Sequence, residues 1–416
     1  MSHALQPPAS APLASGKLQL AARFDVLHVL GLAIAFFLLV GRWTPDRLSG
    51  SSASDGSYLS EPRFLVTVIC TALAIGIACM RPDRTALRYA SSLGSRLWFA
   101  LFWGYLMVAT IWASNYELAG SKAYELLLIA VLHFVILFTV RSRPRQNLVE
   151  GIILGLFVVA LPMALMGVLN PSSVRTGGLL GGGPNVFGRQ MLILTMSSAY
   201  FVMQPNRTKL IKTALLGIMI MATGLVVLSG SRGALLSQIV GIGTLLLFMR
   251  SSMSTRVAIV AFGTIGMIGV LVFTPIGASV IEMFETRVMK QTVQDGHMAG
   301  RETLYWSAIE IGCEKPVFGN GLNTYRDYFG IYPHNIFLEL FSETGSVGVV
   351  LFLALVASSL RPAFRSYMEL ETSLFSLWLG LLAAANFSGD LFDSRLLFLA
   401  LPLLARPRRI DATEAT

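Results

Sequence analysis

Long apolar segments alternate with short polar segments along nearly the whole chain. Most of them have the roughly 17 to 25 residues that a helix needs to cross a bilayer. The pattern therefore predicts twelve membrane-spanning helices. They cover residues 24–41, 63–80, 97–113, 123–140, 149–169, 188–204, 209–229, 233–249, 256–274, 333–360, 372–388 and 392–406.

Composition agrees with an all-α polytopic membrane protein. Of 416 residues, 54% are hydrophobic and 13% are charged, whereas an average soluble domain has about 25% charged residues. A net charge of +9 raises the question of nucleic acid. The basic residues, however, gather at the ends of the predicted spans, so the expected partner is the lipid bilayer and nucleic acid is not expected.

The distribution of basic residues predicts the orientation of the chain. With a cytoplasmic tail at 1–23, the inside segments hold 19 of the 32 Lys and Arg residues, as the positive-inside rule requires. Spans one to nine then occupy 24–274, a long outer loop occupies 275–332, and spans ten to twelve occupy 333–406. A second cytoplasmic tail follows at 407–416. The first span starts late and lacks a small-residue cleavage site, so we expect a retained anchor.

The long outer loop contains its own helical patterns. Residues 301–315 place Leu304, Ala308 and Ile311 on one stripe, with charged residues off it and a proline after it. Residues 281–293 form a second amphipathic candidate, and FGNGLNTY provides a turn-rich connection to span ten. These helices are expected to lie over the outer membrane face or to cap a cavity there.

Span ten begins with an unusual set of polar residues. Pro333 is suited to the first turn of a helix, which places His334 at the outer N-terminus. Asn335, Glu339 and Glu343 then follow at intervals of four residues and share one helical stripe. A buried charge in a membrane costs at least about 2.5 kcal/mol on insertion scales. The stripe is therefore expected to face protein or water.

The position of His334 favours a neutral imidazole. A helix N-terminus disfavours a protonated side chain, so the residue would be free to accept a proton. The alternative is a histidine that merely caps its helix at the membrane interface.

A glycine-rich loop precedes span six. The stretch NPSSVRTGGLLGGGPNVFGRQ carries Arg175, Asn185 and Arg189. Glycines let backbone N–H groups approach a phosphate, and arginines bind its oxygens through paired hydrogen bonds. The lysine and hydroxyl of a Walker loop are missing. The same composition is also typical of a flexible turn.

Three further polar positions fall on the predicted outer side. Arg232 lies in a short hairpin between two spans, where an interfacial, snorkelling arginine is the alternative. Arg301 opens the amphipathic loop helix. NFSGDLFDSR brings Asp390, Asp393 and Arg395 to the same side, where an ordinary polar loop is the alternative.

These groups are suited to a diphosphate substrate. Arginines stabilise a leaving diphosphate, while His334 or a carboxylate takes the proton from an attacking hydroxyl. Neither an ATP motif nor a zinc-ligand spacing such as HExxH is present. We therefore expect no metal and no cofactor, and the energy must come with the substrate.

Several motifs occur in an order that resembles the O-antigen ligase and polymerase superfamily. They are SGSRGALL, RETLYW with KPVFGNGLNTY, and PHNIFLELFSETGSVG, within about residues 170–400. The resemblance implies a lipid-dependent, GT-C-like glycosyltransferase of the bacterial inner membrane. It also implies glycan transfer from undecaprenyl diphosphate at the periplasmic face without nucleotide or metal, with inversion at the anomeric carbon.

The resemblance also implies roles for individual residues. The family's catalytic histidine matches His334, and its essential arginines match best at Arg232 and Arg301, with Arg287 as a rival to Arg301. Asp390 matches a late acidic position among the catalytic candidates. The residues expected to bind the diphosphate or the glycan are Arg175, Asn185, Arg189, Asn335 and Glu339.

Within the superfamily, ligases attach finished O-antigen to the lipid A–core oligosaccharide, and polymerases join repeat units. One major outer loop and the chain length favour the ligase. The polymerase is the first alternative. A solute transporter is an alternative of another class, which predicts internal repeats and ionisable groups near the bilayer midplane.

Overall fold

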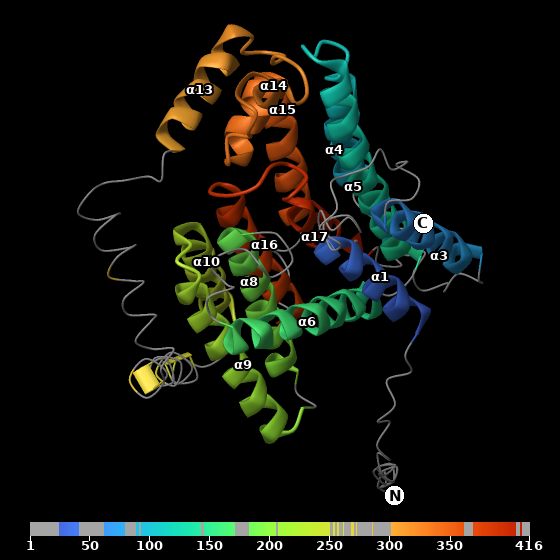
Figure 1. Cartoon of the computed structure of the whole chain (residues 1–416). Helices are drawn as coiled ribbons and strands as arrows, with labels where there is room; N and C mark the ends of the chain where they lie inside the picture. The colour runs from blue at the N-terminus through green and yellow to red at the C-terminus, as the bar shows by residue number, and fades with distance from the viewer. Residues whose placement is uncertain are drawn as a thin grey trace, which may run out of the picture.

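A computed structural model describes most of the chain. It covers residues 25–40, 62–79, 89–90, 93–142, 145–170, 183–204, 207–249, 301–361, 369–404 and 408–409, with a few isolated positions between 253 and 285. These residues are mainly helical (Figure 1). The two-residue strands β1 (Tyr89–Ala90) and β2 (Arg408–Arg409) pair antiparallel.

The helices follow the apolar pattern closely. They are α1 (Val26–Val40), α3 (Pro62–Cys79), α4 (Leu93–Val108), α5 (Tyr116–Ser142), α6 (Arg145–Leu169), α8 (Gly183–Met203), α9 (Lys209–Leu228), α10 (Arg232–Phe248), α13 (Arg301–Glu314), α14 (Thr324–Phe329), α15 (Ile336–Leu360), α16 (Glu369–Ala385) and α17 (Arg395–Leu404). Each predicted span except 256–274 coincides with a helix. Most of that segment lies outside the described residues.

Not all of these helices are long enough to cross a bilayer alone. Within the described residues, 5 helices are long and apolar enough to cross a membrane: α5, α6, α8, α9 and α15. The α17 helix has 10 residues and is therefore about 15 Å long, against a hydrocarbon thickness of about 30 Å. The structure is thus that of an all-helical polytopic membrane protein, while the count of twelve spans stays a prediction.

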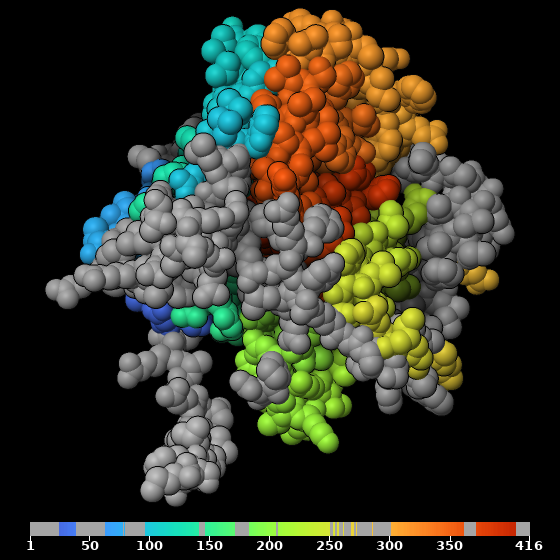
Figure 2. Space-filling view, turned by 180° about the vertical axis from the view of Figure 1, so that it is seen from behind, coloured from blue at the N-terminus to red at the C-terminus, as the bar shows by residue number. Residues whose placement is uncertain are grey.

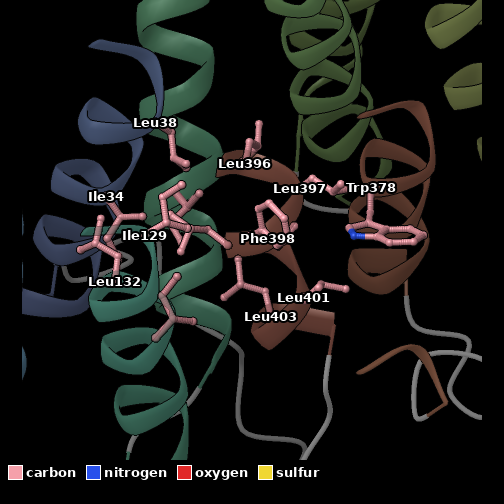
Figure 3. Packing of buried hydrophobic residues seen from close by; sticks show 14 of the residues in the cluster. Ile34, Leu38, Ile129, Leu132, Trp378, Leu396, Leu397, Phe398, Leu401 and Leu403 are labelled. Atoms are coloured by element: carbon pink, nitrogen blue, oxygen red, sulfur yellow. The ribbon is translucent and has the colours of Figure 1, made fainter. Parts of the chain in front are cut away.

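The α17 helix lies at the centre of the bundle. All of its residues are buried, and Phe398 contacts the rings of Phe102 and Trp103 on α4 at 5.8 and 5.2 Å. Figure 3 shows α17 between α5 and α16, with Ile34 and Leu38 of α1 on the side of α5. Because α17 is enclosed, the loop that leads into it is held at a defined place.

Small residues allow two other pairs of helices to approach closely. A Cβ atom at Gly31 of α1 would lie 2.6 Å from the Ile152 backbone nitrogen of α6, and one at Gly188 of α8 would lie 2.2 Å from Cβ of Ala234 on α10. Such contacts are the usual way in which membrane helices pack. The second pair brings the N-termini of α8 and α10 together.

The helices α13 and α14 pack with the start of α15 as an outer layer at one end of the bundle (Figure 1). As predicted, Ala308 and Ile311 are buried, in a cluster with Tyr325 of α14 and Leu338 of α15, while Glu302 and Glu310 are exposed. The predicted 281–293 helix lies outside the described residues, apart from position 285. Figure 2 shows from behind that α4 lies directly beside this orange segment, and α4 packs against α15.

The α15 helix is kinked at Gly345, which has φ 64° and ψ −167°. The kink removes the helical bonds to the carbonyls of Ser342 and Glu343. Those carbonyls instead accept from the backbone nitrogens of Asn320 and Gly321, at 3.1 and 2.9 Å. The turn-rich connection is therefore inserted at the kink, and it divides α15 into an outer segment, 336–344, and an inner segment, 346–360.

Substitution at this kink is expected to destabilise the fold. A Cβ at Gly345 would lie 2.3 Å from the Val317 carbonyl oxygen at a positive φ, so Gly345→Ala should lower the free energy of unfolding by at least about 1–3 kcal/mol. Thermal unfolding in detergent measures the loss. Gly243→Ala is the matched control, because that glycine is helical and a Cβ added there would meet nothing within 4 Å. Equal melting of wild type and Gly345→Ala would contradict this account of the kink.

Candidate functional site

His334 lies just outside the α15 helix. The helix starts at Ile336, and the side chain of Asn335 caps it by accepting from the nitrogens of Phe337 and Leu338 at 3.0 and 3.1 Å. The prediction that Pro333 occupies the first helical turn is therefore wrong. His334 instead adopts a left-handed conformation with φ 59°, because Asn335 satisfies the free amides and the chain must turn before it.

The surroundings of His334 favour its neutral form. Burial lowers the pKa of the imidazole below its ordinary value, and the positive charges of Arg301 and Arg189 act in the same direction. Asp393 and Asp390 oppose this shift. The direction agrees with the sequence-based expectation, but the main cause is burial rather than the helix terminus. Its Nδ1 is buried without a hydrogen-bond partner among the described residues.

The loop between α16 and α17, residues 386–394, connects the separate parts of the site. The Asn386 carbonyl accepts from the Tyr305 hydroxyl of α13 at 3.1 Å and from Asn335 Nδ2 at 3.5 Å. A Cβ at Gly233 of α10 would lie 2.6 Å from Cβ of Phe387. Figure 1 shows this red loop between the orange outer layer and the nearest ends of α8 and α10.

Arg189 of α8 binds the same loop. Its Nη1 donates to the Asp393 carbonyl at 3.1 Å, and its Nη2 lies 4.0 Å from Asp393 Oδ2. Asp390 Oδ1 accepts from the Asp393 nitrogen at 2.8 Å. Gly389 has φ 84°, and a Cβ there would lie 3.1 Å from Arg189 Nη1. A glycine is thus required where the arginine crosses the loop.

Arg301 is the first residue of α13 and is held near His334 by that helix. Its side chain hydrogen-bonds to Tyr305. Burial raises the pKa of Tyr305, and Arg301 offsets part of this rise. The Tyr325 hydroxyl donates to the Leu304 carbonyl at 2.9 Å. Two tyrosines therefore fix the start of α13 against the outer layer and the α16–α17 loop.

Arg232 begins α10 between two residues with defined contacts. The hydroxyl of Ser231 donates to Oδ1 of Asn185 on α8 and accepts from the Ala234 nitrogen at 3.2 Å. Gly233 contacts the α16–α17 loop, as described above. The half-buried Arg232 therefore extends from the junction of α8, α10 and this loop.

The α16–α17 loop is also anchored to helices from the N-terminal part of the chain. Arg395 Nε donates to the Leu38 carbonyl of α1 at 2.9 Å. Both Arg395 and Arg63 of α3 lie over the Phe392 ring, at 5.1 and 5.0 Å from its centre. These contacts, together with the burial of residues 388–392, hold the loop against α1 and α3.

Glu339 lies in a different environment from the one expected. It is fully buried, and Lys122 Nζ of α5 donates to its Oε1 at 2.6 Å and to both Glu343 carboxylate oxygens at 2.7 Å. The prediction that the stripe faces protein is confirmed, whereas a contact of Glu339 with substrate stays a prediction. The sequence analysis missed Lys122, because it directly precedes a predicted span and resembles an ordinary flanking residue.

The remaining candidates lie outside the described residues: Arg175 and Arg287. Part of the described set lies around His334, whereas Asn185 and Arg232 are linked to that place only through the contact of Gly233 with Phe387 of the α16–α17 loop. Arg189, Arg301, Asp390 and Asp393 are all within electrostatic range of His334, and Asn335 shares a carbonyl partner with Tyr305 of the Arg301 helix. Such a group of side chains can bind an anion and accept a proton beside it.

The fold and the site define an all-helical, multi-pass membrane protein with a charged site at one end of its bundle. Residues 216–353 match the family described as O-antigen ligase. This match confirms the resemblance to the O-antigen ligase superfamily. The matched segment contains Arg232, Arg301 and His334, while α1 to α8 precede it. No curated protein matches the chain.

Proposed function

We propose that this protein is an O-antigen ligase that transfers a glycan from undecaprenyl diphosphate to the lipid A–core oligosaccharide. The observation that carries the proposal is the gathering of Arg189, Arg301, Asp390 and Asp393 within electrostatic range of a half-buried His334. The superfamily match supports a lipid-linked glycan as substrate. The orientation from the basic residues supports a site at the periplasmic face of the bacterial inner membrane, with both termini cytoplasmic.

The arginines would bind the diphosphate of the donor. Guanidinium groups form paired, charge-assisted hydrogen bonds to phosphate oxygens. Arg301 and Arg189 come from α13 and α8, and Arg232 begins α10, so the diphosphate would lie among three helices. The isoprenoid tail would remain in the bilayer beside the bundle.

His334 would act as the general base. Its neutral imidazole accepts the proton of the acceptor hydroxyl as that oxygen forms a bond to the anomeric carbon. The bond from the anomeric carbon to the diphosphate breaks, and undecaprenyl diphosphate leaves with the bonding electrons. Asp390 and Asp393 favour the imidazolium that results, since both raise the pKa of His334. One displacement inverts the anomeric centre.

Purified protein tests this proposal directly. Wild type should convert lipid A–core to a slower-migrating product when it is mixed with glycan-loaded undecaprenyl diphosphate in detergent. Arg232→Ala should reduce the rate roughly tenfold or more, because a charge-assisted bond contributes about 1.5–3 kcal/mol. Arg207→Ala is the matched control, since Arg207 is exposed and contacts Gln204 and the Phe201 ring. Absence of transfer by correctly folded wild type would refute the proposal.

A polymerase of the same superfamily is the remaining alternative, because the match covers a segment that both activities share. Deletion of the coding sequence separates the two. Loss of a ligase should leave long polymer on the lipid carrier, whereas loss of a polymerase should leave single repeats on the core. The second phenotype would reassign the acceptor from core sugar to growing glycan and leave the role of His334 unchanged.

A further inference from the structure

A buried ion triad joins α5 to α15. Lys122 Nζ contacts Glu339 Oε1 at 2.6 Å and Glu343 Oε2 at 2.7 Å. The three residues are 6%, 0% and 1% exposed. Because Lys122 and Glu339 are 217 positions apart in sequence, the triad is a tertiary contact between two helices.

The triad acts on the outer segment of α15, residues 336–344. Both glutamates belong to this segment, and the kink at Gly345 separates it from the rest of the helix. The kink gives the outer segment a direction different from that of the inner segment. Lys122 binds one face of it, the backbone of Asn320 and Gly321 binds its end, and Asn335 connects its start to the α16–α17 loop.

The triad pairs one lysine with two buried carboxyl groups, and Glu339 Oε2 has no hydrogen-bond partner among the described residues. Asp390 adds further negative charge within electrostatic range of Lys122 and Glu339. Buried ion pairs of this kind often contribute little to stability compared with apolar side chains, and the best-attested use of such groups is to specify one register of packing.

We propose that Lys122 is a positioning residue for His334. By binding both glutamates, it fixes the rotation of the outer segment about its axis and its position along that axis. The N-cap of this segment, Asn335, directly follows His334. The imidazole is thereby held against Arg301 and the α16–α17 loop. Asp390 lies within electrostatic range of both the triad and His334. For its effect on catalysis, the inference rests on the proposed glycan transfer.

Three variants test this role. Lys122→Met leaves two buried carboxylates without a cation and is expected to unfold readily. The triple variant Lys122→Met, Glu339→Gln and Glu343→Gln removes all three charges together and should keep the fold. Lys122→Arg retains a cation and should recover activity relative to Lys122→Met. Lys209→Met, an exposed lysine on α9, is the control.

Kinetics and hydrogen exchange give the decisive readouts. The triple variant should melt near the wild-type temperature, yet its kcat should fall roughly a hundredfold, because small displacements of catalytic groups cost that much. Its KM should stay within about threefold, since the arginines proposed to bind the diphosphate are unchanged. Amides of 336–344 should exchange faster than in wild type, whereas those of 346–360 should not.

Two results would overturn the inference. One is a triple variant with wild-type kcat and wild-type protection of 336–344. The other is equal loss of protection in both segments of α15, which would indicate a general structural role. If wild type itself transfers no glycan, the proposed function fails, and the exchange comparison alone still decides whether Lys122 orders the outer segment.

Discussion

Replacing His334 with asparagine is expected to reduce glycan transfer by ~10³-fold while leaving the protein folded. General-base catalysis contributes about 10²–10⁴-fold, and an amide cannot accept the proton. Asparagine is the informative substitution because His334 has φ 59°, a region that asparagine tolerates. His334→Ala has the same chemical deficit and adds backbone strain, so it should also melt at a lower temperature.

The pH dependence of wild type provides a second check on the base. Burial, Arg301 and Arg189 lower the pKa of His334. The imidazole therefore becomes protonated only at a pH below the ordinary histidine pKa of about 6.5. The acid limb of kcat/KM should therefore lie below pH ~6.5. His334→Asn should lose this limb. If the asparagine variant kept the wild-type rate and profile, the base would be another group.

Some of the architecture was predictable from local pattern. The apolar periods identify the helices, and in α13 the spacing of Ala308 and Ile311 correctly indicates which face is buried. Such patterns depend on residues three or four apart, and these interact directly in a helix. The length of α17 was less predictable, because apolar residues fill it whether it spans the membrane or lies inside the bundle.

The start of α15 shows where a local rule misled. Proline is common in the first helical turn, and Pro333 precedes a strongly apolar run. Asparagine is an equally strong N-cap signal, and it prevails here because its side chain accepts two backbone amides. The helix therefore starts at Ile336, three residues after Pro333, and His334 lies in a turn rather than in the helix.

The candidate site was predictable as a set of residues but not as a geometry. The orientation argument places Arg189, Arg301 and Asp390 on one side of the membrane. It does not reveal that the α16–α17 loop joins them, since its contacts are backbone carbonyls of Asn386 and Asp393. Lys122 had one indirect signal: two carboxylates one turn apart in a membrane helix require a cation from elsewhere.

Replacing Arg301 with methionine should affect binding and proton transfer together. Loss of a charge-assisted bond to the diphosphate, worth about 1.5–3 kcal/mol, should lower kcat/KM roughly tenfold to a hundredfold. Arg301 also lowers the pKa of His334, so its removal should raise that pKa. More of the imidazole is then protonated at a given pH, and the acid limb of kcat/KM should move to higher pH.

The direction of this movement separates Arg301 from a residue that only binds phosphate. Arg326→Met is the matched control, because Arg326 is an exposed arginine on α14 in the same outer layer. It should change neither the rate nor the acid limb. Profiles of kcat/KM from pH 4 to 9 measure both effects, over a range of pH that spans the ordinary histidine pKa of about 6.5. If Arg301→Met lowered the rate but left the acid limb of kcat/KM unchanged, Arg301 would bind the donor without influencing His334. The two residues would then not belong to one site.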